Sequence, residues 1–221
     1  MKMSKILIFA ILALLTRLSE ASTIVVDSFT EGPYNLSYGS DLNNTSAVSS
    51  PLGSSRFSRI NDREAIAGAV VTSTLDDSLG TLNFAVDGLS SNAARPLDLR
   101  LAYSQGGPFS IVGYSAFEFD FSAVTGAGFL IIELGSATAV YGPTTNRINL
   151  GGPGVVTVPF SQLNFGTNGS INSFNSLHFT FEAATEEFSI SMNEIRVVPE
   201  PSVIALVMPF LLTILLGRRR N

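Results

Sequence analysis

Two carboxylates in the segment Phe117-Glu118-Phe119-Asp120-Phe121 are the clearest candidates for chemistry in this chain. In an extended strand, residues i and i+2 point to the same face about 7 Å apart. A pair of carboxylates at such a separation is what a glycosidase uses as acid and nucleophile. The same pattern is typical of a solvated strand face whose phenylalanines are packed. Because no flanking histidine signals a cleft, we favour the solvated face and expect no catalytic residue and no enzyme.

A metal site is a second hypothesis. Asp76-Asp77 precedes a predicted turn, and carboxylates in turns are common Ca²⁺ ligands. Asp27 and Glu194 would also meet if the first and last strands were neighbours. The chain has no EF-hand spacing, no cysteine and a single histidine, His178, so a zinc centre is excluded. We therefore expect no metal and no cofactor, and we place His178 on the surface.

Exposed planar rings are the expected feature of a sugar-binding protein. Tryptophan is absent, so the candidates among the five tyrosines are those in polar, loop-like stretches: Tyr34, Tyr38 and Tyr141. The competing interpretation is that the tyrosines cap the core, with each hydroxyl at its wet edge.

The elements that position these residues are strands. Short runs rich in Val, Ile, Phe and Thr alternate with Gly, Asn, Ser and Pro, and no amphipathic helix pattern appears. The sequence predicts an all-β fold, a single antiparallel β-sandwich or jelly roll. Its strands are expected at residues 23–29, 65–75, 80–87, 97–103, 116–122, 128–134, 155–159, 176–182 and 188–198, with edge strands possible near 34–38 and 55–60.

The net charge of residues 22–201, the part between the two apolar ends of the chain, limits which partners it can bind. Residues 22–201 contain seven arginines, no lysine and seventeen acidic residues, a formal net charge of −10. Such a surface repels nucleic acid, so we expect no DNA- or RNA-binding role and no nucleic-acid partner.

The N-terminus has the layout of a secretory signal. Two lysines precede the apolar run ILIFAILALL, and small residues end the segment at Ala21. Ten apolar residues span only about 15 Å as a helix, roughly half of the bilayer core. We predict a signal peptide at residues 1–21, cut by signal peptidase between Ala21 and Ser22.

The C-terminus carries a second apolar segment. Pro199-Glu200-Pro201 precedes an uncharged run at residues 203–217, and Arg218, Arg219 and Arg220 follow. The run predicts a short transmembrane helix, with the arginines as a cytoplasmic stop-transfer cluster. The sequence thus divides into the signal peptide, a sandwich domain at 22–198 and a tail at 199–221.

This tail resembles the PEP-CTERM sorting signal of Gram-negative bacteria. The resemblance covers about the last two dozen residues and depends on three elements in order: Pro-Glu-Pro, an apolar segment and a terminal arginine cluster. It implies recognition of Pro199, Glu200 and Pro201 by exosortase, a membrane protease. It also implies transient anchoring by the helix, followed by release to the cell envelope, the surface or the medium.

A weaker resemblance concerns about forty residues of the domain. The segments VPFSQL at 158–163 and NEIRVV at 193–198 are similar to the last strands of carbohydrate-binding-module and galactose-binding-like jelly rolls. The chain has Asn193-Glu194 where those domains often have Asp-Asn or Asp-Asp. The resemblance implies a fold more than a function.

Three functions are therefore open. We favour an exported, non-catalytic sandwich with a structural or adhesive role, processed through its tail by exosortase. The alternative is a carbohydrate-binding module that acts on extracellular polysaccharide. The third is a hydrolase that uses Glu118 and Asp120.

Overall fold

The structure is a computed structural model that describes residues 22–38, 42–50, 53–61, 69–88, 97–135, 147–163 and 174–200. These residues form two antiparallel sheets. The seven-stranded sheet contains β1 (Ile24–Asp27), β2 (Tyr34–Ser37), β5 (Val70–Asp76), β6 (Thr81–Asp87), β8 (Tyr114–Thr125), β11 (Gly154–Pro159) and β13 (Glu187–Pro199). The six-stranded sheet contains β3 (Asn43–Ser50), β4 (Gly53–Asn61), β7 (Asp98–Phe109), β9 (Gly128–Gly135), β10 (Ile148–Leu150) and β12 (Phe174–Ala183).

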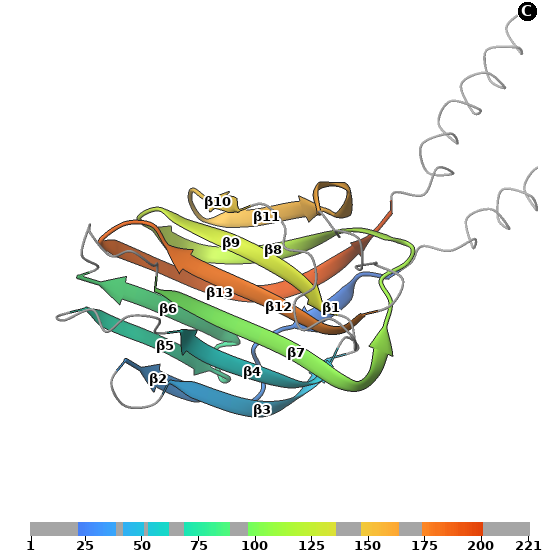
Figure 1. Cartoon of the computed structure of the whole chain (residues 1–221), viewed down its shortest axis with the longest axis horizontal. Helices are drawn as coiled ribbons and strands as arrows, with labels where there is room; N and C mark the ends of the chain where they lie inside the picture. The colour runs from blue at the N-terminus through green and yellow to red at the C-terminus, as the bar shows by residue number, and fades with distance from the viewer. Residues whose placement is uncertain are drawn as a thin grey trace, which may run out of the picture.

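The long strand β13 organises the seven-stranded sheet, whose order is β11-β8-β13-β6-β5-β2. One edge of β13 pairs with β8, and its other edge pairs first with β6 and then with β1. The six-stranded sheet has the order β10-β9-β12-β7-β4-β3 and lies face to face with the first (Figure 1). The chain is thus a β-sandwich of the jelly-roll type, and the predicted fold class is confirmed.

Phenylalanines from both sheets fill the space between the layers. On β8, Phe117, Phe119 and Phe121 alternate with outward-facing polar residues, as the sequence predicts. Phe179 of β12 meets the rings of Phe117 and Phe119 edge-on, with centroids 5.4 and 5.1 Å away. Phe181 meets Phe121 in the same way at 6.2 Å. Edge-to-face packing of this kind adds to the free energy gained by burying the rings.

Two strands lie where the sequence predicts loops. The polar run of β3 pairs with β4 at the edge of its sheet, and the three residues of β10 pair with β9. These residues form strands because a partner strand is available for pairing. Sequence patterns measure only the intrinsic strand propensity of the residues, which is low for Asn and Ser. The strands suggested near 34–38 and 55–60 are present as β2 and β4, but only β2 is an edge strand, because β4 lies between β3 and β7.

The predicted signal peptide and C-terminal helix lie outside the described residues. Within the described ranges, helical structure is limited to a 3₁₀ turn at Phe160–Gln162, and no helix there has the length and hydrophobicity needed to cross a bilayer.

The packing predicts that Phe179→Ala destabilises the domain severely. This side chain is fully buried and touches rings from both sheets, so its removal leaves a cavity. We expect a loss of about 3–5 kcal/mol in the free energy of unfolding, measured by urea denaturation. The half-exposed Val155→Ala is the control and should change it by less than about 0.5 kcal/mol. Equal effects of the two substitutions would contradict this account of the core.

Candidate functional site

Three charged or polar side chains meet on the outward face of the six-stranded sheet. Strand alternation places Leu101 and Phe179 in the core, so their neighbours Arg100 and His178 face outward. The register sets His178 opposite Glu133 of β9 and diagonally from Arg100, which is paired with Thr180 two residues along β12. Three adjacent strands, β7, β12 and β9, thus bring together an arginine, a histidine and a glutamate that are far apart in the sequence.

Their geometry is fixed by direct contacts. Arg100 Nη2 donates to Glu133 Oε2 at 3.1 Å and also contacts His178 Nδ1. The distance from His178 Nδ1 to Glu133 Oε2 is 3.6 Å. About a quarter to a fifth of each side chain is exposed (26%, 21% and 21% for Arg100, Glu133 and His178), so the cluster is both accessible and held in place.

Two phenylalanine rings lie on the same face. Phe57 of β4 is paired with Ala102, which in turn is paired with His178, and its ring is half-buried. Phe129 of β9 lies under the guanidinium of Arg147, whose central carbon is 5.2 Å from the ring centroid. The face therefore combines flat apolar rings with hydrogen-bonding groups.

A row of acidic groups borders this cluster. Glu182 of β12 pairs in register with Asp98 of β7, and both are almost fully buried although they point outward. Glu182 Oε2 is 2.9 Å from Arg147 Nη2. This carboxylate is therefore neutralised by the arginine that also covers Phe129.

Sequence reasoning missed both rings because it searched tyrosines alone. Phe129 belongs to the run FLII, which is apolar on both faces, so one half of that run had to face outward. Phe57 is separated by three positions from the buried Ile60, and residues three apart on a strand face opposite sides. These two signals were available in the sequence. The order of the strands in the sheet, which brings these rings onto one face with Arg100, Glu133 and His178, could not be read from the sequence.

The tyrosines contribute to the core rather than to an exposed platform. Tyr34 is 8% exposed, and its hydroxyl lies 3.2 Å from Ser73 Oγ. Burial raises the pKa of Tyr34, against the smaller opposing effect of hydrogen bonds from Ser58 and Ser73. Tyr38 packs half-buried against the core, and Tyr141 lies outside the described residues. Because Tyr34 is buried, its ring is removed from the sugar-contact candidates.

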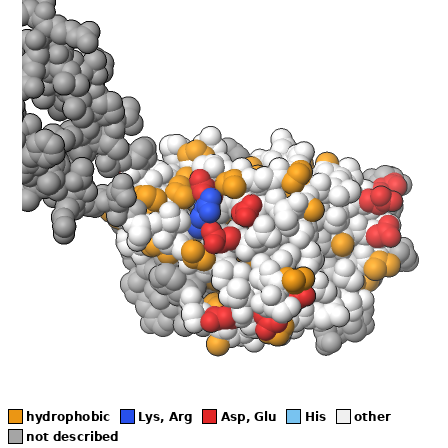
Figure 2. Space-filling model, turned by 180° about the vertical axis from the view of Figure 1, so that it is seen from behind, with side chains coloured by type: hydrophobic (Ala, Val, Ile, Leu, Met, Phe, Trp, Pro, Cys, Tyr) orange, Lys and Arg blue, Asp and Glu red, His pale blue; other side chains and the backbone are white. Residues whose placement is uncertain are grey.

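The carboxylates Glu118 and Asp120 occupy the outward face of the other sheet, as predicted. Arg196 Nε donates to Glu118 Oε2 at 2.7 Å, and Asn193 Nδ2 donates to Asp120 Oδ2 at 3.2 Å. The hydrogen bond to Glu118 raises the pKa of Arg196. Figure 2, seen from behind, shows basic atoms in one place with acidic atoms around them. The pair is thus engaged in ion-pair and amide contacts, which favours the solvated-face interpretation.

The calcium hypothesis gains no support from the geometry. Asp76 Oδ1 accepts hydrogen bonds from the backbone and hydroxyl of Ser78 and from the backbone of Leu79, so it closes the β5–β6 turn. The hydroxyl of Ser78 is the main cause of the lowered pKa of Asp76. Asp27 faces the core, whereas Glu194 lies 3.3 Å from Arg196 on the outer face. No group of three acidic or histidine side chains suited to a metal occurs in the described ranges.

A buried ion pair joins the two sheets behind the candidate face. Arg56 of β4, which is fully buried, donates from Nη1 to Asp27 Oδ2 of β1 at 2.6 Å. The Tyr103 hydroxyl donates to the same oxygen at 2.8 Å. Arg56 Nη2 donates to the carbonyl oxygens of Glu31 and Gly32 at 2.7 and 3.0 Å. Every contact holds the segment that follows β1 against the six-stranded sheet.

The pKa values of this cluster show that burial and pairing compete. Burial disfavours the charge on Arg56, yet Asp27 and Tyr103 together outweigh that effect and raise its pKa. Burial, with the nearby Asp27 carboxylate, raises the pKa of Tyr103 well above its ordinary value. The guanidinium therefore stays charged and the phenol stays protonated across the physiological range.

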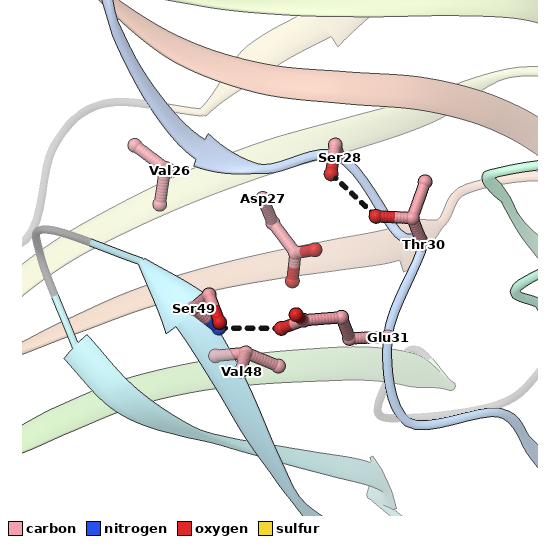
Figure 3. A pocket seen from close by; sticks show the side chains of 7 residues that line it. All are labelled: Val26, Asp27, Ser28, Thr30, Glu31, Val48 and Ser49. Carbon is pink, nitrogen blue, oxygen red and sulfur yellow. Dashed lines mark hydrogen bonds between the residues drawn. The ribbon is translucent and has the colours of Figure 1, made fainter.

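A polar pocket of about 200 Å³ lies beside the ion pair (Figure 3). Its walls come from the segment after β1 and from β3: Val26, Asp27, Ser28, Thr30, Glu31, Val48 and Ser49. The Glu31 carboxylate accepts a hydrogen bond from the backbone of Ser49, and the hydroxyls of Ser28 and Thr30 are 2.9 Å apart. Because Asp27 and Glu31 already accept hydrogen bonds from the protein, the pocket is a weaker candidate site than the sheet face.

The predicted processing sites lie at the limits of the described chain. Ser22 is exposed at its start, and Ala21, Pro201, Arg218, Arg219 and Arg220 lie outside the described residues. At the other end, β13 finishes at Pro199, whose carbonyl accepts a hydrogen bond from the Ser115 hydroxyl at 3.1 Å. The backbone N–H of Glu200 donates to the Gly113 carbonyl at 3.2 Å. The Pro-Glu-Pro motif thus begins at the last residue of the last strand.

Comparison with known proteins places the fold but no family. No family model and no curated protein matches the chain. Among solved structures it is similar to a family 12 xyloglucanase from Bacillus licheniformis, at 9% identity and a TM-score of 0.50, over 76% of this chain and all of that one. It is also similar to the family 11 carbohydrate-binding module of a Clostridium thermocellum cellulase, at 13% identity and a TM-score of 0.46, over 82% of this chain and 97% of that one. Because a shared fold at such low identity does not define a function, it does not decide between catalysis and binding.

The buried pair predicts that Asp27→Asn destabilises the domain by about 3–5 kcal/mol, because it leaves the Arg56 charge buried without its counter-ion. Urea denaturation measures the effect. Adding Arg56→Met to Asp27→Asn should recover part of the loss, since no buried charge then remains.

The matched control is Glu118→Gln, which weakens a partly exposed ion pair. We expect it to cost less than about 1 kcal/mol. If Asp27→Asn cost no more than Glu118→Gln, the buried pair would not have the role assigned to it.

Proposed function

We propose that the domain binds polysaccharide on the outward face of the six-stranded sheet. The observation that carries this proposal is the combination on one face of two rings, Phe57 and Phe129, with the contacting cluster of Arg100, Glu133 and His178. This was the alternative function at the level of sequence, and the geometry favours it over a purely structural role.

The chemistry of sugars suits such a surface. A pyranose ring has an apolar C–H face, which packs against an aromatic ring, and a rim of hydroxyls, which exchange hydrogen bonds with polar side chains. Hydrogen bonds to charged groups are stronger than those between neutral groups. Because Arg100 is already fixed by Glu133, little side-chain freedom is lost when a ligand binds.

A hydrolytic role is less well supported. Glu118 is engaged by Arg196, Glu133 by Arg100 and Glu182 by Arg147, so each of these carboxylates already has a cationic partner. A glycosidase needs one carboxyl group that keeps a proton and a second that stays ionised.

We further propose that the protein is exported, anchored transiently by its C-terminal apolar segment and processed by exosortase at Pro199-Glu200-Pro201. The sequence of the tail carries this proposal. It is supported by the position of the motif, because β13 ends at Pro199 and Glu200 is exposed. Processing there would release the sandwich to the envelope or the medium, where polysaccharide is available as a partner.

Phe57→Ala should weaken polysaccharide binding about tenfold, which corresponds to about 1.4 kcal/mol, because the ring supplies the apolar contact. The full chain, kept in a detergent without a sugar headgroup, is tested on a glycan array and then by titration with the best ligand. Val155→Ala, on the outward face of the other sheet, is the control and should leave the affinity unchanged. Absence of binding to every glycan, or equal affinities for both variants, would refute the proposed site. Release of new reducing ends during the incubation would instead indicate a hydrolase.

Intact-mass measurement on envelope and culture fractions tests the processing. We expect the mature protein to begin at Ser22 and to lack the arginine cluster, because both predicted cleavages remove a terminal segment. Replacing Pro199, Glu200 and Pro201 by alanine should leave the tail attached. If the arginine cluster stays on all copies of the unaltered protein, the tail is a permanent anchor.

A further inference from the structure

Two arginines stand directly opposite each other on the candidate face. The register of β4 and β7 pairs Arg59 with Arg100, and alternation places both side chains outward, because Ile60 and Leu99 beside them are fully buried. Like charges directly opposite on neighbouring strands destabilise a sheet. The fold tolerates this repulsion at the centre of the surface proposed to bind polysaccharide.

The two arginines differ in their partners. Arg100 is held by Glu133 and His178, whereas Arg59 is exposed and makes no ion pair or hydrogen bond within the described part of the chain. Arg147 on the same face is paired with Glu182, and Asp98 is only 4% exposed. Arg59 is therefore an accessible cation of this face that has no partner within the described ranges.

This distribution contrasts with residues 22–201 as a whole, whose formal net charge is −10. Besides the buried Arg56, four arginines have described positions: Arg59, Arg100, Arg147 and Arg196. The first three lie on or over the six-stranded sheet. On the opposite face, Arg196 is held by Glu118 and Glu194. At physiological ionic strength, charges more than about 8 Å away are largely screened, so the local cations decide what binds here.

We propose that Arg59 and Arg100 form a subsite for a carboxylate, and that the ligand is an acidic polysaccharide containing uronic acid residues. This inference rests on the proposed function, and it specifies the ligand class. A carboxylate between the two strands would relieve the repulsion between the guanidinium groups. The guanidinium of Arg59 presents a planar fork of donors that matches a carboxylate in a bidentate contact. Phe57, two residues before Arg59 on the same strand face, would support the sugar ring that carries this carboxylate.

The test compares an acidic with a neutral polymer on the full chain in an uncharged detergent without a sugar headgroup. Polygalacturonate and mixed-linkage β-glucan are titrated at 50 and at 300 mM NaCl. We expect polygalacturonate to bind at least tenfold more tightly at low salt, and added salt to weaken its binding alone. Arg59→Gln should weaken polygalacturonate binding about tenfold without affecting the glucan, and Arg59→Lys should restore part of the loss.

Arg196→Gln removes one positive charge from the opposite face and is the matched control. It should leave polygalacturonate binding unchanged. If Arg196→Gln and Arg59→Gln weaken binding equally, only the net charge matters and the subsite is refuted. If the glucan binds as tightly as polygalacturonate and Arg59→Gln has no effect, the subsite is refuted while the proposed polysaccharide binding stands. Absence of binding to both polymers and to a wider glycan array overturns both proposals.

Discussion

The buried ion pair between Asp27 and Arg56 is the interaction on which the arrangement of this sandwich depends. It joins β1 in one sheet to β4 in the other, and Tyr103 and two backbone carbonyls supply further hydrogen bonds to the charged groups. Removing two charges from water is costly, so a buried pair contributes more to specifying one structure than to raising overall stability. Here it specifies the register of β4. With Arg56 pointing inward, Phe57 must point outward, and a slip of one residue would exchange them.

The two outward faces follow from this constraint and differ in character. The face of the seven-stranded sheet carries Glu118, Asp120 and Glu194 around Arg196, which pairs with both glutamates, so this face is acidic on balance. The face of the six-stranded sheet has half-buried rings and, beside Arg100, the exposed Arg59, which has no partner within the described ranges. Between the faces, the edge-to-face contacts of Phe179 with Phe117 and Phe119 hold the layers together. A well-packed core of this kind holds the strands in place, so outward-facing side chains can keep fixed positions on the surface of a sheet.

Much of the fold could be predicted from local patterns, and most of the site could not. Alternation in the segments around Phe119 and Phe179 predicted which residues are buried, because side-chain direction on a strand has a period of two. The polar strand β3 was missed, because its formation depends on pairing with β4 rather than on its own composition. The cluster of Arg100, Glu133 and His178 was missed because it depends on strand order, which no local pattern encodes. Tyr34 was proposed for sugar contact from its polar neighbours, but its ring is part of the core.

The most direct test of the central claim is to map where a polysaccharide fragment contacts the protein, by backbone-amide NMR shifts during titration with an oligosaccharide that binds. The account predicts that the largest changes fall on β4, β7, β9 and β12, around Phe57, Arg100 and His178. Changes concentrated on β8 and β13 around Glu118 and Arg196, or in the polar pocket beside Asp27, would contradict it.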